Sequence, residues 1–177
     1  MIESGEDVAL WHVSPRCVGS ASIDPALDDD EELWETVWVA AHEAGPVHEW
    51  MDLSFTTDSP TPSSVLYVEE AEVLVYADPV RSAVEGVRTP ASDHVWLPVT
   101  VVANGSELRY WLLSCQVPDA ARPDGTLDRA SARDATVVHF QIGDNFPAFS
   151  GSARRAIEEA CVDVVFGRAD LPTGRVD

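Results

Sequence analysis

The chain has 177 residues, of which 31 are acidic and 11 are basic, so its formal net charge at pH 7 is -20. A field of this sign repels phosphate backbones and anionic lipids, which argues against nucleic acid and membrane surfaces as partners and favours a basic protein. The same charge is also typical of an acidic surface that does no more than keep a protein soluble.

Hydrophobic residues make up 45% of the chain, and six of its residues are tryptophan. A chain of this length and composition can bury a core of its own, so we expect a single domain over residues 1–177. A loop rich in Pro, Ser and Thr at 57–64 marks a possible seam after an N-terminal subdomain of residues 1–60.

The three cysteines, Cys17, Cys115 and Cys161, have no CxxC spacing. The first residues lack the basic and apolar regions of a signal peptide, and no run approaches the roughly 18 apolar residues of a membrane span. We therefore expect a cytoplasmic protein whose thiols are reduced.

The N-terminal part predicts a strand at 8–13 followed by the longest helix of the chain, within 22–46. Acidic residues crowd the start of this helix, where the helix dipole favours negative charge, and a Gly-Pro pair ends it. Its apolar residues form one stripe that we expect to dock on a sheet: Leu33, Trp34, Val37, Trp38 and Ala41.

The centre of the predicted fold is a β-hairpin. Two β-rich runs, 95–103 and 108–117, flank Asn104-Gly105, a dipeptide that favours the positive φ values of a tight hairpin turn. Both runs are apolar on both faces, which is typical of strands inside a layered structure.

The remaining segments complete a single α+β domain. We expect a mixed or antiparallel sheet of about six to seven strands around the central hairpin, covered by one long helix at 25–44 and two short ones. The further elements are strands at 50–56, 72–77, 136–142 and 162–166, a helix starting at Asp78-Pro79 and ending near Gly86, a polar excursion at 118–134, an irregular stretch at 143–149, and a helix at 153–160 capped by Ser150 or Ser152.

Histidines offer the first candidates for chemistry. A zinc protease places two histidines one helical turn apart with a glutamate between them, whereas His42 and His48 are six residues apart with a Gly-Pro break between them. We interpret His42 as the C-terminal residue of a helix and His48 as a turn residue. His12 and His139 lie in predicted strands and are interpreted as core or edge histidines.

Cysteine nucleophiles need a thiolate beside a histidine or a helix N-terminus. Cys115 and Cys161 fall on apolar sides of predicted elements and are interpreted as small buried residues, which leaves Cys17 as the cysteine to test. A pocket containing His42, His48 or Cys17 would indicate an enzyme of unfamiliar type.

The strongest surface feature is a run of carboxylates at the start of the long helix. Several of them share the helix face opposite the tryptophans, so their charges should point outward together. They form either a solvated helix start or a landing surface that steers a basic protein into contact. The run comprises Asp28, Asp29, Asp30, Glu31, Glu32 and Glu35.

Several segments after residue 74 follow one another in a recognisable order. They are Val75-Tyr76-Ala77-Asp78 before a short helix, Val95-Trp96-Leu97-Pro98-Val99, Tyr110-Trp111-Leu112-Leu113, Val117-Pro118-Asp119-Ala120, and a final helix before Val164-Val165-Phe166. This order, over residues 74–166, resembles a family of immunity proteins from bacterial polymorphic toxin systems, first catalogued as a domain of unknown function. The resemblance implies a role in binding and blocking a cognate toxin, with no catalytic residues to carry over.

We therefore expect a non-enzymatic inhibitor that neutralises a basic toxin or enzyme through the acidic helix, without catalytic residues, cofactor or bound metal. The alternatives are the unfamiliar enzyme and a structural subunit of a larger assembly. A large exposed apolar patch around the tryptophans would favour the structural subunit. The oligomeric state is left open.

Overall fold

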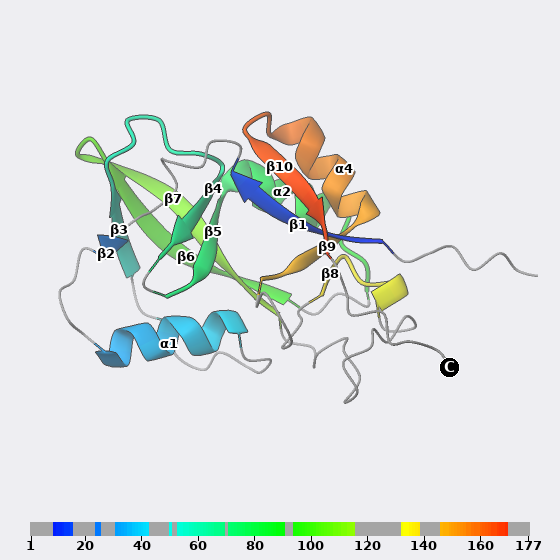
Figure 1. Ribbon diagram of the computed structural model, residues 1–177, viewed down its shortest axis with the longest axis horizontal. Coiled ribbons are helices and arrows are strands. Elements are labelled where there is room, and N and C mark those ends of the chain that lie inside the picture. The colour runs from blue at the N-terminus through cyan, green and yellow to red at the C-terminus, as the bar shows by residue number, and fades with distance from the viewer. Residues whose placement is uncertain are drawn as a thin grey trace, which may run out of the picture.

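The structure, a computed structural model, describes residues 9–15, 24–25, 31–42, 50, 53–69, 71–90, 94–115, 132–138 and 146–169. Over these ranges the protein is an α+β fold with three helices and two β-sheets (Figure 1). The elements are β1 (Leu10–Pro15), β2 (Asp24–Pro25), α1 (Glu31–His42), β3 (Leu53–Thr57), β4 (Val65–Val68), β5 (Val73–Ala77), α2 (Asp78–Gly86), β6 (His94–Ala103), β7 (Ser106–Cys115), β8 (Val137–Val138), β9 (Ala148–Ser150), α4 (Gly151–Ala160) and β10 (Val164–Arg168).

The β6–β7 hairpin lies at the centre of the larger sheet, as the sequence predicts. Its strands pair in register from His94 opposite Cys115 to Ala103 opposite Ser106. The turn is the expected Asn104-Gly105, whose φ angles of 50° and 74° are the positive values that this type of turn requires.

The larger sheet has the strand order β2-β3-β6-β7-β5-β4. It is mixed, because β3 runs parallel to β6 while the other neighbouring strands run antiparallel. Strand β4 was not among the predicted elements, and it pairs with Val73 to Tyr76 of β5, a strand that was predicted.

The remaining described strands form a separate antiparallel sheet with the order β10-β1-β9-β8. The single sheet predicted from the sequence is therefore wrong: its strands are divided between two sheets. Strand β1 pairs with β10 across almost the full length of the chain, and β9 begins inside the stretch 143–149 that was predicted to be irregular. Alternation within each strand carries no information about such distant partners, which is why the division was not foreseen.

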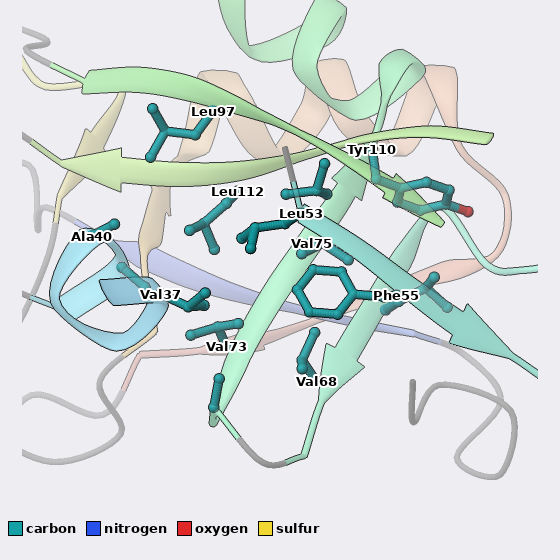
Figure 2. Packing of buried hydrophobic residues seen from close by; sticks show 14 of the residues in the cluster. Val37, Ala40, Leu53, Phe55, Val68, Val73, Val75, Leu97, Tyr110 and Leu112 are labelled. Atoms are coloured by element: carbon teal, nitrogen blue, oxygen red, sulfur yellow. The ribbon is translucent and has the colours of Figure 1, made fainter. Parts of the chain in front are cut away.

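The larger sheet is covered on both faces, as its apolar strands predict. Residues alternate along β5 and β7, so that Val75 and Leu112 point to one face while Tyr76 and Leu113 point to the other. The first face packs against Val37 of α1 (Figure 2), and we call this cluster the α1-side core. The second face packs against α2, α4 and the smaller sheet, and we call it the α2-side core.

The buried face of α1 agrees with the predicted stripe at Val37 and Ala41 and differs from it at Trp38. Val37, Ala40 and Ala41 are buried, whereas Trp38, which was expected in the docking stripe, is 39% exposed. Val37, Ala40 and Ala41 follow the i, i+3, i+4 spacing of one helical face, and two alanines let the helix approach the sheet closely. The side chains of the other two stripe residues, Leu33 and Trp34, lie outside the described part.

The two shorter helices match their predictions more closely. Helix α2 begins at Asp78 with Pro79 in its first turn and ends at Gly86. Helix α4 has Ser150 as its N-cap, with the Ser150 hydroxyl accepting a hydrogen bond from the Ala153 backbone N–H. None of the described helices has the length and apolar character needed to cross a membrane.

Candidate protein-binding surface

The acidic run lies at the N-terminal end of α1. Asp28, Asp29 and Asp30 fall outside the described residues, and Glu31 and Glu32 form the first helical residues without a description of their side chains. The remaining member of the run, Glu35, is exposed, as an outward-pointing charge should be.

Two large apolar side chains share the exposed side of α1 with Glu35, so the prediction that the acids lie on the face opposite the tryptophans is wrong for Glu35 and Trp38. Trp38 is 39% exposed and Val39 is 38% exposed. They lie three and four residues after Glu35, and residues with this spacing are neighbours on a helix surface. We call Glu35, Trp38 and Val39 the α1 outer face; it combines a negative charge with an aromatic ring and an aliphatic side chain.

The α1 outer face is held in position by contacts that α1 makes with the rest of the fold. On the opposite side of α1, Val37 is 1% exposed and packs into the α1-side core beneath the sheet. The Trp38 ring contacts the ring of His42, with their centroids 5.1 Å apart, and His42 is itself 5% exposed at the last turn of the helix. A side chain held in this way loses less conformational entropy on binding than a free one.

The other candidates for chemistry are only partly described. Cys17, His48 and His139 lie outside the described residues, whereas His12 is half-buried in β1 with its Nδ1 3.4 Å from the carbonyl oxygen of Pro147. His42 ends α1, as predicted. Whether His42, His48 and Cys17 share a pocket stays a prediction, and no cluster of His, Cys, Asp and Glu suited to a metal ion occurs among the described residues.

The two described cysteines are free and buried, as predicted. Burial raises the pKa of the Cys115 thiol to about 12 and also raises the pKa of Cys161. Both thiols are therefore protonated at neutral pH, which is the unreactive form.

A polar cluster at the end of α2 was not foreseen from the sequence. The Glu85 carboxylate accepts a hydrogen bond from Trp96 Nε1 at 2.8 Å, lies 3.0 Å from Nε2 of the buried His94, and forms an ion pair with Arg88 at 3.2 Å. Partial burial acts to raise the pKa of Glu85, but these hydrogen bonds outweigh it and hold the pKa below its ordinary value.

The Glu85 cluster is a structural anchor for α2. His94 lies opposite Cys115 in the hairpin, so an acid, an imidazole and a thiol lie close together in the fold. However, His94 is 1% exposed and the thiol of Cys115 is held protonated. A nucleophilic cysteine instead needs an accessible site and a deprotonated thiolate. Because acidic residues are abundant in this chain, nothing in the sequence distinguished Glu85 from the others.

Two arginine side chains in the described part, those of Arg81 and Arg154, lie over tryptophan rings of the same chain. Arg81 lies 3.9 Å from the Trp111 ring centroid and 4.0 Å from Asp78, and Arg154 lies 3.9 Å from the ring centroid of Trp11. In these contacts the guanidinium groups of Arg81 and Arg154 interact with groups of the same chain. The α1 outer face contains no arginine.

No protein-family model matches the chain, and no curated protein matches it either.

Proposed function

We propose that this protein is a non-enzymatic inhibitor of the immunity type, which binds and neutralises a basic toxin or enzyme through the acidic end and outer face of α1. The observation that carries the proposal is the α1 outer face, where Trp38 and Val39 are exposed beside Glu35. Tryptophan is enriched among the residues that dominate binding energy at protein interfaces. A mixed aromatic and acidic face is suited to a basic partner.

Electrostatics support a basic partner. The net charge of -20 produces a negative field, and the guanidinium groups of Arg81, Arg88 and Arg154 are paired with carboxylates of the same chain. A negative field accelerates the encounter with a positively charged partner and repels nucleic acid. An inhibitor that covers a cleft meant for an anionic substrate would use this complementarity.

The resemblance of residues 74–166 to bacterial immunity proteins supports a toxin as the partner class. Its segments form the hairpin, α2, α4 and β10, which make the scaffold of the domain. In this proposal the scaffold holds α1 in place, and α1 selects the partner.

Affinity capture tests the proposal. The tagged protein is incubated with extract of its native cells at low salt and at about 0.5 M salt, which screens exposed charge pairs. We expect a stoichiometric basic protein that is retained at low salt and weakened at high salt. Capture of no basic protein at either salt concentration contradicts the proposal.

A charge variant then locates the surface. Replacing Asp29, Asp30, Glu32 and Glu35 with serine should slow association with the captured partner and flatten its salt dependence. The matched control carries four serines at exposed acids elsewhere: Asp58, Glu69, Glu107 and Glu159. Both variants change the net charge by the same amount, so equal on-rates for the two would remove α1 from the interface.

A further inference from the structure

Tryptophan, a carboxylate and arginine recur together in this fold. In the first example the guanidinium of Arg81 lies 3.9 Å from the ring centroid of Trp111, and the indole N–H of Trp111 donates a hydrogen bond to Asp78 at 2.6 Å. Asp78 also lies 4.0 Å from Arg81, three residues further along α2. The carboxylate thus contacts both the ring and the cation that lies over the ring.

The second example involves α4 and the smaller sheet. The Arg154 guanidinium lies 3.9 Å from the ring centroid of Trp11 in β1, and its Nε donates a hydrogen bond to Glu158 at 2.9 Å. Again a helix supplies an arginine and an acid one turn apart, and the arginine lies over a tryptophan. Attraction between a cation and the negative face of the ring, together with the ion pair, favours this arrangement.

The α1 outer face has two of these three components. Glu35 and Trp38 are three residues apart on α1, which is the spacing that separates Asp78 from Arg81 on α2. Both side chains are exposed. In the part of the chain that the structure describes, no arginine lies over the Trp38 ring and no ion pair involves Glu35.

We propose that Glu35 and Trp38 together receive an arginine side chain from the basic protein partner. The guanidinium lies over the Trp38 ring and pairs with the Glu35 carboxylate, while Val39 borders the aliphatic part of the arginine side chain. This inference rests on the proposed function, which it makes more specific by naming the residue type that α1 recognises. Lysine is a poorer fit, because a compact, strongly hydrated ammonium does not stack on a ring as a planar guanidinium does.

The test uses two peptides and the intact protein. One peptide has nine residues that alternate glycine and arginine, with blocked ends, and the other has lysine in place of every arginine. Each is titrated into ¹⁵N-labelled protein while the indole N–H resonances of the tryptophans are followed, with the Trp38 signal assigned from the Trp38→Leu variant. We expect the arginine peptide to shift the Trp38 signal and to bind about two- to fivefold more tightly than the lysine peptide.

Variants separate stacking from charge. Trp38→Leu should remove the preference for arginine, whereas Glu35→Gln should weaken both peptides, and Glu107→Gln, at an exposed acid on β7, should change neither the preference nor the Trp38 shift. Equal affinity for the two peptides, or an arginine-dependent shift at another tryptophan only, overturns the inference. The ratio of the two peptide affinities is measured in the unmodified protein, so this part of the test stays valid even if a variant is poorly folded.

Failure of this inference and failure of the proposed function give different results. A basic partner captured from extract, combined with peptides that leave Trp38 unchanged, rejects the arginine site and keeps the inhibitor function. An arginine-selective shift at Trp38 without any basic partner in extract keeps the site and rejects the inhibitor function.

Discussion

The Asp163 carboxylate accepts a hydrogen bond from the backbone N–H of Ser64 at 2.6 Å and joins the two sheets of the fold. Ser64 directly precedes β4 in the larger sheet, and Asp163 directly precedes β10 in the smaller sheet. The hydroxyl of Ser63 donates a second hydrogen bond to the same carboxylate at 3.0 Å. The Asp163 carboxylate thus connects the half-buried segment before β4 with the edge strand of the smaller sheet.

Replacement of Asp163 by alanine should lower the free energy of unfolding by about 1 kcal/mol, since hydrogen bonds to a charged group contribute more than neutral ones but partial exposure weakens them. Urea unfolding at pH 7 measures the change. Asp58→Ala, at an exposed acid on the adjacent loop, is the control and should change the free energy by less than about 0.5 kcal/mol. Equal effects of the two substitutions would mean that Asp163 does not join the sheets.

The Asp163 contribution should depend on pH in a defined direction. Partial burial acts to raise the pKa of Asp163, but the hydrogen bonds from Ser64 and Ser63 outweigh it and hold the pKa below its ordinary value. A lowered pKa means that the stabilisation is present above the unfolded-state pKa of about 3.9 and is lost as the pH falls through the folded-state pKa. The stability difference between the unmodified protein and Asp163→Ala should therefore be constant from pH 6 to 8 and shrink below about pH 4.

The Glu85 cluster gives a second stability prediction. Glu85→Ala leaves Trp96 Nε1 and the buried His94 Nε2 without their carboxylate partner, which should cost about 1–3 kcal/mol. Urea unfolding of this variant is compared with that of Glu107→Ala, an exposed acid, for which we expect less than about 0.5 kcal/mol. A loss as small as that of the control would show that the cluster does not anchor α2.

Features specified by neighbouring residues were predictable from the sequence. Asn104-Gly105 set the hairpin and its register, and Ser150 was one of two serines proposed to cap α4. The turn depends on the preference of Asn and Gly for positive φ values. The cap depends on the side-chain oxygen of the serine itself. The α+β class followed from the alternation and spacing of such elements.

Features that depend on distant residues were not predictable. The pairing of β1 with β10 divides the strands into two sheets, and no pattern within either strand specifies its partner. On α1 the sequence permits two overlapping apolar stripes that share Val37 and Ala41, and in the fold Ala40 is buried with them while Trp38 is exposed. The candidate site was therefore half foreseen: Glu35 was expected at the surface, and the aromatic residue beside it was not.

The hairpin turn permits a paired test of glycine conformation. Gly105 has a φ of 74°, which residues with a Cβ rarely adopt, so Gly105→Ala should destabilise the protein by about 1–2 kcal/mol. Gly86, at the end of α2, has neither a positive φ nor a heavy atom within 4 Å of an added Cβ. Gly86→Ala should therefore be stabilising by up to about 1 kcal/mol, because alanine is the better helix former. Thermal unfolding measures both changes, and a melting temperature of Gly105→Ala as high as that of Gly86→Ala would contradict the turn assignment.

Loss of the hydroxyl group should change the free energy of unfolding differently at two buried tyrosines. The Tyr110 hydroxyl donates a hydrogen bond to the carbonyl oxygen of Ser63 at 2.8 Å, so Tyr110→Phe should cost about 1 kcal/mol. The Tyr76 ring packs edge-on against Trp96 and Phe149, its buried hydroxyl has no hydrogen-bond partner in the described part of the chain, and burial raises the pKa of Tyr76. Because an unsatisfied buried hydroxyl is itself costly, Tyr76→Phe should leave the free energy of unfolding unchanged or raise it by up to about 1 kcal/mol. Urea unfolding of the two variants side by side decides the matter, and a loss from Tyr76→Phe as large as that from Tyr110→Phe would show that the Tyr76 hydroxyl is hydrogen bonded in the folded protein.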